Sequence, residues 1–264
     1  MLIDVLPIWA LFFISVGLVL GSAEIGYRVG RAVRGTADCE REEPASSISG
    51  VILGLFAFIL AFTFSLVSER YDLKKSLVRD EANAIRTVWH RSDFLPESDR
   101  ARSKELLQSY VAKRVAVAQE YPDSPGSAKP VIEEAVRTQK QLWDLALTNG
   151  RLDMNSDIGA LYVESVNELA NVHALRVGVG INARVPTTMW IVLICLLMLS
   201  VSGLGYYTAI ADSPRSKVTA VLAVAFALVF ALIAALDRPG NRFMPVYQDA
   251  LISLMSEMEA DTKQ

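Results

Sequence analysis

Residues 48–91 change from a membrane-like to a water-soluble composition without any signal that would end a helix. Residues 48–68 are apolar and uncharged, whereas residues 69–91 are charged but keep apolar residues at three- and four-residue steps. No proline or glycine lies between Gly54 and Arg91. We therefore predict one continuous helix, about 65 Å long, whose first half crosses a bilayer and whose second half lies in water.

Four apolar segments are each long enough to cross a membrane as a helix. They are residues 5–27, 48–68, 186–208 and 218–236. A polar insert, residues 69–184, separates the second from the third and contains 17 basic and 17 acidic residues. The expected fold class is all-α: an integral membrane protein with four transmembrane helices and a soluble helical bundle inserted between helices two and three. The balanced charge of the insert excludes the basic surface that a nucleic-acid-binding protein needs.

The expected organisation has four parts along the chain. Transmembrane helices one and two lie in residues 1–68, the soluble domain in 69–184, helices three and four in 185–237, and an amphipathic tail in 238–264. The first helix of the soluble domain continues transmembrane helix two. Because the N-terminus carries Asp4 and no basic residue before the apolar segment, we expect this segment to be retained rather than cleaved as a signal peptide.

Amphipathic spacing predicts three further helices inside the insert and one in the tail. They are residues 98–120, 131–148, 156–176 and 245–258, and the last could fold back on the bundle. Pro96 is expected to break the long helix, and Asn149-Gly150 to stop the helix that begins at residue 131. Ser46 and Ser47 are expected to cap the second transmembrane helix.

A stripe of side chains on the second transmembrane segment is the candidate wall of a pore. The stripe consists of Leu55, Phe58, Phe62 and Ser65, which follow one another at steps of three and four residues and so share a face of the helix. Such a face either packs against lipid or other helices, or forms a hydrophobic constriction. Gly50 and Gly54 form a small-xxx-small pair that permits close approach of another helix.

Charged residues stand at the ends of two membrane segments. Glu24 is either an ion or proton site or an interfacial acid paired with Arg28 four residues later. Asp237 and Arg238 either form ion pairs with other helices or end the fourth segment as a polar stop before Pro239. Both alternatives remain open for each pair.

The chain contains no pattern of residues that indicates catalysis. The cysteines, Cys39 and Cys195, and the histidines, His90 and His173, lack the spacing of metal ligands, and the glycines Gly178 and Gly180 do not follow a strand. We therefore expect no enzyme, no cofactor and no metal site.

Several segments together resemble the bestrophin-like family of bacterial four-helix membrane proteins. The segments are RDEANAIRTVWHRSDFLPE (79–97), LLQSYVAKRV (106–115), VPTTMW (185–190) and LDRPGNRF (236–243). The resemblance extends over residues 45–256. It implies kinship to bestrophins, which are pentameric anion channels lined by the second membrane helix. The calcium-binding acids of animal bestrophins have no counterpart in this chain, so calcium gating is not expected.

The leading functional hypothesis is a homo-oligomeric ion channel in a bacterial inner membrane, with the lipid bilayer and inorganic ions as partners. The rival hypothesis is a non-conducting sensor or scaffold whose helical domain binds protein partners. Basic residues flank the membrane segments on both sides, so the charge rule for topology gives conflicting orientations. The resemblance to bestrophins favours a cytoplasmic domain and cytoplasmic termini.

Overall fold

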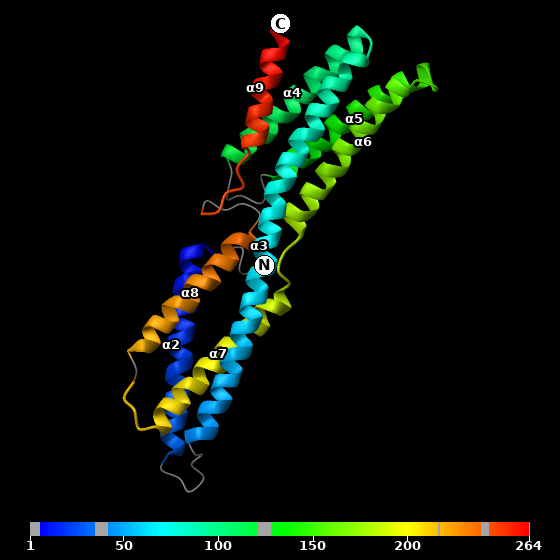
Figure 1. Cartoon of the computed structure of the whole chain (residues 1–264). Coiled ribbons are helices and arrows are strands. Elements are labelled where there is room, and N and C mark those ends of the chain that lie inside the picture. Colours follow the sequence, from blue (N-terminus) through cyan, green and yellow to red (C-terminus); the bar gives the residue numbers. More distant parts are fainter. Residues whose placement is uncertain (1–5, 35–41, 121–127, 216, 239–242, 264) are drawn as a thin grey trace. The chain divides into compact units, whose positions relative to one another are not determined.

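The computed structural model describes residues 6–34, 42–120, 128–215, 217–238 and 243–263, and every regular element in these ranges is helical. Figure 1 shows the elements, which in chain order are α2 (Ile8–Val33), α3 (Glu42–Arg91), η1 (Ser92–Phe94), α4 (Glu97–Glu120), α5 (Ala128–Leu152), α6 (Asp157–Val177), η3 (Gly178–Asn182), α7 (Thr187–Ile210), α8 (Val218–Asp237) and α9 (Asp249–Thr262). Cys39 and residues 121–127 lie outside the described residues. Four of the helices, α2, α3, α7 and α8, are long and apolar enough to cross a membrane.

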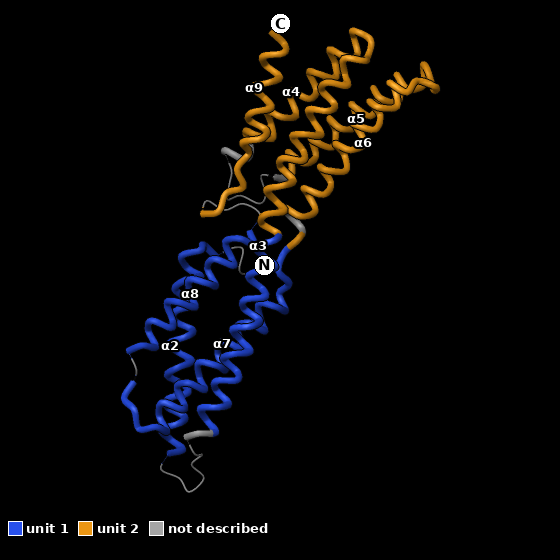
Figure 2. Tube along the Cα trace, viewed as in Figure 1, with its two compact units in different colours: residues 1–69, 184–238 blue, residues 70–183, 239–264 orange. Residues whose placement is uncertain are grey.

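The chain divides into two compact units (Figure 2). The first unit contains residues 1–69 and 184–238, and the second contains residues 70–183 and 239–264. Helix α3 contributes to both, because it runs as a single helix from Glu42 to Arg91. The described part of this helix therefore includes the whole stretch that the sequence analysis expects to be continuous.

Helix α3 begins earlier than its sequence suggests. It already includes Glu42, so Ser46 and Ser47 lie inside the helix and the expected caps are wrong. Pro44 does not prevent this early start, because it lies in the first turn, where a backbone N–H has no partner within the helix. The serine that follows, Ser49, donates its hydroxyl hydrogen to the carbonyl oxygen of Ala45 at 2.7 Å.

In the first unit, α2 packs against α7 and α8, and glycines allow α2 and α7 to touch along their backbones. A Cβ atom added to Gly26 of α2 would lie 1.9 Å from the carbonyl oxygen of Ser202 in α7. One added to Gly205 of α7 would lie 2.2 Å from the carbonyl oxygen of Ala23. These two positions are therefore closed to any side chain unless the helices separate.

Helix α3 packs on α8 through aromatic rings. The buried ring of Phe56 lies edge to face with Phe226 at 5.1 Å between centroids, and stacks on Phe230 at 6.3 Å. Trp190 of α7 contacts the same Phe230 ring at 6.0 Å. Aromatic side chains of three helices thus form one layer of the interior of this unit.

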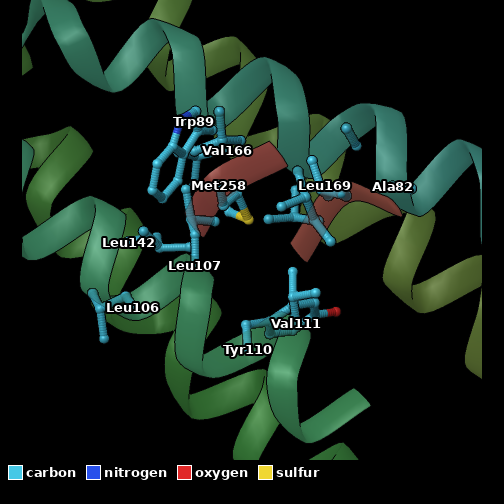
Figure 3. Close-up of a cluster of buried hydrophobic side chains, with 14 of the residues drawn as sticks. Ala82, Trp89, Leu106, Leu107, Tyr110, Val111, Leu142, Val166, Leu169 and Met258 are labelled. Carbon is cyan, nitrogen blue, oxygen red and sulfur yellow. The ribbon is translucent and has the colours of Figure 1, made fainter. Parts of the chain in front are cut away.

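The second unit has its own apolar core, part of which Figure 3 shows. Each of α3, α4, α5 and α6 contributes side chains at three- and four-residue spacing, as an amphipathic helix should. The fully buried members include Ile85, Leu107, Leu142 and Leu169, one from each of these helices. Helix α9 adds Leu251, Leu254 and Met258, so the C-terminal helix is part of this core.

Helix α5 passes through the predicted stop at Asn149-Gly150 and ends at Leu152, so that prediction is wrong. The Asn149 amide does not compete with the helical backbone, because its Nδ2 donates to Asp99 Oδ2 at 2.8 Å and to the carbonyl oxygen of Leu145 at 2.9 Å. The next helix begins close to the predicted position. Ser156 caps α6 by accepting a hydrogen bond from the N–H of Gly159 at 3.1 Å.

Candidate functional site

The predicted stripe on α3 faces away from the rest of the chain. Leu55, Phe58 and Phe62 are 50%, 68% and 63% exposed, and Ser65 is exposed as well. The opposite side of the same helix carries the residues that pack inside the first unit. These are Ser49, Phe56, Leu60, Thr63 and Val67, all buried. The exposed face therefore has no partner among the helices that the structure describes.

The exposed stripe is longer than the one predicted from the sequence. It begins at Ile48 and Val51, which are 56% and 72% exposed, and continues in alternating steps of three and four residues to Ser65. The positions repeat every seven residues, which is the spacing of helices that associate along a seam. Gly50 and Gly54, the candidate packing residues, have open space beside them in the single chain. A helix that approaches them must come from another subunit, which stays a prediction.

The acid at the end of α2 is held by two arginines. Glu24 accepts a hydrogen bond from Arg28 Nε at 2.8 Å, which is the pairing of neighbours four residues apart that the spacing predicts. Arg215, in the link between α7 and α8, donates to both carboxylate oxygens of Glu24 at 2.9 and 3.0 Å. The guanidinium of Arg215 also lies over the ring of Tyr27 at 4.7 Å. Glu24 thus connects α2 to that link.

The acid at the end of α8, Asp237, is buried and connects this end of α8 to the residues that precede α7. Asp237 accepts a hydrogen bond from the backbone N–H of Val185 at 2.9 Å, and its other oxygen lies 3.4 Å from Nε of Arg184. Arg238 donates to the carbonyl oxygen of Leu6. Both residues therefore contact distant parts of the chain, and their ion pairing with other helices stays a prediction.

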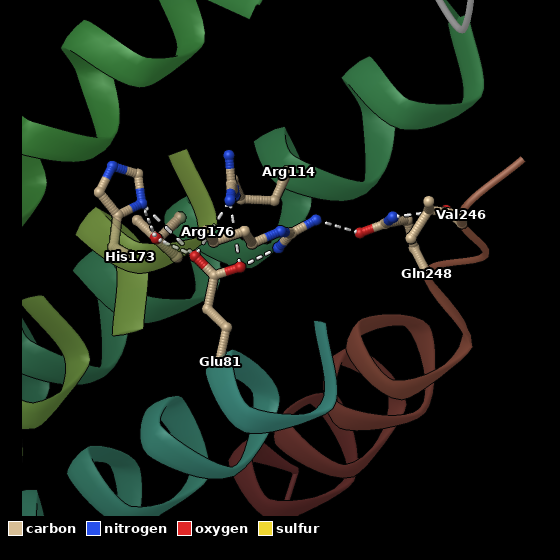
Figure 4. A network of polar contacts seen from close by, with 7 residues as sticks. Glu81, Arg114, His173, Arg176, Val246 and Gln248 are labelled. Carbon is tan, nitrogen blue, oxygen red and sulfur yellow. Dashed lines mark hydrogen bonds and ion pairs between the residues drawn. The ribbon is translucent and has the colours of Figure 1, made fainter. Parts of the chain in front are cut away.

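A second group of polar side chains is buried inside the bundle of the second unit (Figure 4). At its centre is Glu81 of α3, which is fully buried. Arg114 Nη2 of α4 donates to the two carboxylate oxygens at 3.2 and 3.1 Å, and Nη1 of Arg176 in α6 donates to one of them. Arg176 also donates to Oε1 of Gln248 at 2.5 Å. We call Glu81, Tyr110, Arg114, His173, Arg176 and Gln248 the Glu81 cluster.

Tyr110 and His173 complete the Glu81 cluster, and their hydrogen bonds assign the histidine tautomer. The hydroxyl of Tyr110 donates to Glu81 Oε1 at 2.5 Å. Its oxygen, 3.0 Å from Nδ1 of His173, must then accept, so the proton of the neutral imidazole is on Nδ1. Burial, with the nearby charge of Arg114, lowers the pKa of His173 to about 4, so the ring is neutral at pH 7.

Burial also affects the other members of the Glu81 cluster. It lowers the pKa of Arg176 to about 10 and raises the pKa of the Tyr110 hydroxyl, so the guanidinium stays charged and the phenol stays neutral at pH 7. Two charged arginines thus share one carboxylate in a largely dry interior. Such an arrangement depends on the carboxylate, because a buried charge without a partner is costly.

Glu81 is absent from the site residues predicted from the sequence, although a signal for it was present. Glu81 lies between Val78 and Ile85, at the three- and four-residue steps that place apolar residues of α3 in the core. An acid at such a position must be paired inside the fold. Its partners Arg114 and Arg176 are 33 and 95 residues away, and no local pattern indicates them.

Within the described ranges, no group of three or more His, Cys, Asp or Glu side chains could hold a metal ion. His90 is exposed on α3, and Cys195 is a free, exposed cysteine on α7.

Most of the chain is similar to known proteins. The family model described as the bestrophin-like domain matches residues 16–251. A crystal structure of a bacterial bestrophin homologue from Klebsiella pneumoniae, in a mutant form, has a TM-score of 0.59 at 15% identity, covering 96% of this chain and 99% of that one. A second crystal structure, of a membrane protein, has a TM-score of 0.57 at 14% identity and covers 96% of each chain. At these identities, the similarity shows the fold alone. No protein with curated function matches.

Proposed function

We propose that this chain, which belongs to the bestrophin-like family, is one subunit of a homo-oligomeric ion channel whose pore is lined by α3. The observation that carries this proposal is the exposed stripe from Ile48 to Ser65 on a helix that is long and apolar enough to cross a membrane. The described residues of a single chain give that face no partner. A ring of subunits would turn it toward a common axis.

The membrane architecture that goes with this proposal uses α2, the first part of α3, α7 and α8 as four spans. Only 11% to 33% of the residues in the apolar windows of these helices are buried inside the chain. Most of their surface is therefore free to contact lipid or neighbouring subunits. The second unit, which carries the Glu81 cluster and the core shown in Figure 3, would be the soluble domain, formed by the insert between spans two and three together with the C-terminal segment that includes α9.

The proposed conduction path narrows at Phe58 and Phe62. Two phenylalanines one helical turn apart, repeated by each subunit, would form two adjacent apolar rings that resist wetting. Leu55 and Ser65 would line the path on either side of these rings. The resemblance implies a ring of five subunits and a pore for anions, and the sign of the conducted ion is the subject of the further inference below.

Conductance in reconstituted bilayers tests the constriction. Replacing Phe58 and Phe62 together with alanine should raise the single-channel conductance, because the apolar rings would widen. Phe64→Ala is the matched control, since this phenylalanine is on the same helix but outside the stripe. Equal currents from the wild type and the double variant would contradict the constriction. A monomeric particle in detergent, measured by its mass, would contradict the ring.

The proposed orientation places the second unit and both termini in the cytoplasm, with the protein in the inner membrane. The resemblance to bestrophins supports this choice. A reporter enzyme that is active only in the periplasm, fused after Gln264, tests it. The expected result is no activity, and strong activity would reverse the orientation.

A non-conducting scaffold is the second candidate, and one surface of the second unit supports it. A groove of about 570 Å³ lies between α5 and α6, lined in part by Trp143, Met154 and Val163. Met154 and the nearby Leu152 are 87% and 75% exposed. Exposed apolar side chains around a groove are typical of a protein-binding surface. Absence of current from every variant, over a range of salts, would favour this function.

A further inference from the structure

The exposed face of α3 continues beyond Ser65 to an acidic residue, Glu69. Glu69 lies seven residues after Phe62 and four after Ser65, so it falls on the same face of the helix. Its side chain is exposed, and it forms no ion pair with any other residue that the structure describes. Between Ile48 and Ser68 the helix carries no charge at all. Glu69 is therefore the first charge on the stripe after the two phenylalanines.

The basic residues next to Glu69 do not neutralise this face. Lys74 is buried, with 6% of its surface exposed. Arg70 is half-buried, and its Nη1 is fully covered. Lys75 is exposed, but its Nζ lies 3.6 Å from the carboxylate of Asp72 and balances that charge. The exposed residues of this segment of α3 thus leave the charge of Glu69 unbalanced.

We propose that Glu69, repeated by each subunit around the axis, forms an acidic ring that makes this channel select for cations. The inference rests on the proposed function, because only a pore lined by α3 brings the copies of Glu69 together. Rings of aspartate or glutamate attract cations into a pore and repel anions. The lining residues of this chain thus favour cations, whereas the resemblance implies anions.

The size of the effect follows from the focusing of charge in a narrow, low-dielectric passage. A cleft lined by charges of one sign raises the local concentration of counter-ions by about tenfold or more. The charge of one exposed carboxylate is largely screened in salt solution, whereas copies facing one another across a pore add their potentials. Removing this ring should therefore lower the cation-to-anion permeability ratio by about tenfold.

Reversal potentials across a planar bilayer in a KCl gradient test the proposal. The wild type should reverse toward the potassium equilibrium potential, Glu69→Gln should reverse close to zero, and Glu69→Lys should reverse toward the chloride equilibrium potential. Glu97→Gln is the matched control, because Glu97 is 90% exposed at the start of α4 and lies outside the stripe. This control should keep the wild-type reversal potential. Because Glu69 is exposed and unpaired among the described residues, its variants should fold like the wild type.

The outcomes separate this inference from the channel itself. Currents that are anion-selective in the wild type, or that reverse at the same potential in Glu69→Gln, would overturn the acidic ring and leave the channel intact. Absence of current from the wild type and from every variant would overturn the channel and the ring together. A shift as large in Glu97→Gln as in Glu69→Gln would assign the effect to general surface charge and would also overturn the ring.

Discussion

Replacing Glu81 with glutamine should destabilise the helical bundle of the second unit. The substitution keeps the size of the side chain but removes the negative charge that Arg114 and Arg176 both contact. Arg114 and Arg176 are only 12% and 16% exposed, so water cannot take the place of the carboxylate. The hydroxyl of Tyr110, which donates to Glu81 Oε1, would meet an amide in place of a carboxylate.

The magnitude follows from the burial of these groups. Breaking a buried ion pair by removing one partner costs about 3–5 kcal/mol, because the other charge stays buried. The amide oxygen of glutamine can still accept a hydrogen bond, so the lower end, about 3 kcal/mol, is expected for Glu81→Gln. For a protein of this size, 1 kcal/mol lowers the melting temperature by about 2–4 °C. The variant should therefore melt about 6–12 °C below the wild type.

Thermal unfolding in detergent, followed by circular dichroism, measures this difference. Glu257→Gln is the matched control, because Glu257 also accepts two hydrogen bonds from one arginine, Arg86, but is 54% exposed. An exposed pair of this kind contributes less than about 1 kcal/mol. A double variant, Glu81→Gln with Arg114→Gln, should recover part of the loss, since it removes one of the two positive charges left buried. Equal melting temperatures for Glu81→Gln and Glu257→Gln would refute the reasoning.

Substitutions at three further positions should change the stability measured in the same unfolding assay. As the pH falls, the unfolded chain takes up a proton on His173 near pH 6.5, but the folded chain does so only near pH 4. The contribution of neutral His173 to the free energy of unfolding is thus fully present above pH 6.5. It is lost as the pH falls from 6.5 to 4, by up to about 3 kcal/mol. His173→Gln should flatten this pH dependence. Gly26→Ala should cost about 1–3 kcal/mol, because its Cβ would lie 1.9 Å from a backbone oxygen of α7, whereas Gly17→Ala, with nothing within 4 Å, should be neutral or stabilising. Asp237→Ala should cost about 1–3 kcal/mol by leaving the buried N–H of Val185 without its acceptor, and an unchanged melting temperature would contradict this.

Family membership and an all-helical fold could both be predicted from the sequence. The helices follow from hydrophobic periodicity, which depends only on the geometry of one helix and on residues a few positions apart. The pairing of Glu24 with Arg28, one turn apart, is local in the same sense. Two local predictions were wrong. At Ser46 the helix begins earlier, because Pro44 is tolerated in its first turn. At Asn149-Gly150 the helix continues, because the Asn149 side chain is bound by groups outside its own backbone turn.

The exposed stripe on α3 depends both on the spacing of residues in the sequence and on the packing of the helices. The spacing of Phe58 and Phe62 determined that they share a face, but only the packed structure decided which face of α3 is left without partners. The sequence pointed to Gly50 and Gly54 as the small residues for close packing. In the structure, Gly26 and Gly205 allow the backbones of α2 and α7 to touch, and the packing role of Gly50 and Gly54 stays a prediction.

The sequence by itself determined which segments are helices and which of their faces are apolar, because these properties repeat with the helical period. Only the tertiary structure decided which polar and charged groups meet. Glu81 finds Arg114 and Arg176 across 33 and 95 residues, and Asp237 finds Val185 across 52. Such pairs form because packing removes water from charged groups, and each group then needs whichever opposite charge or donor the neighbouring helix places beside it. That neighbour is set by how the helices pack, which no short stretch of sequence encodes.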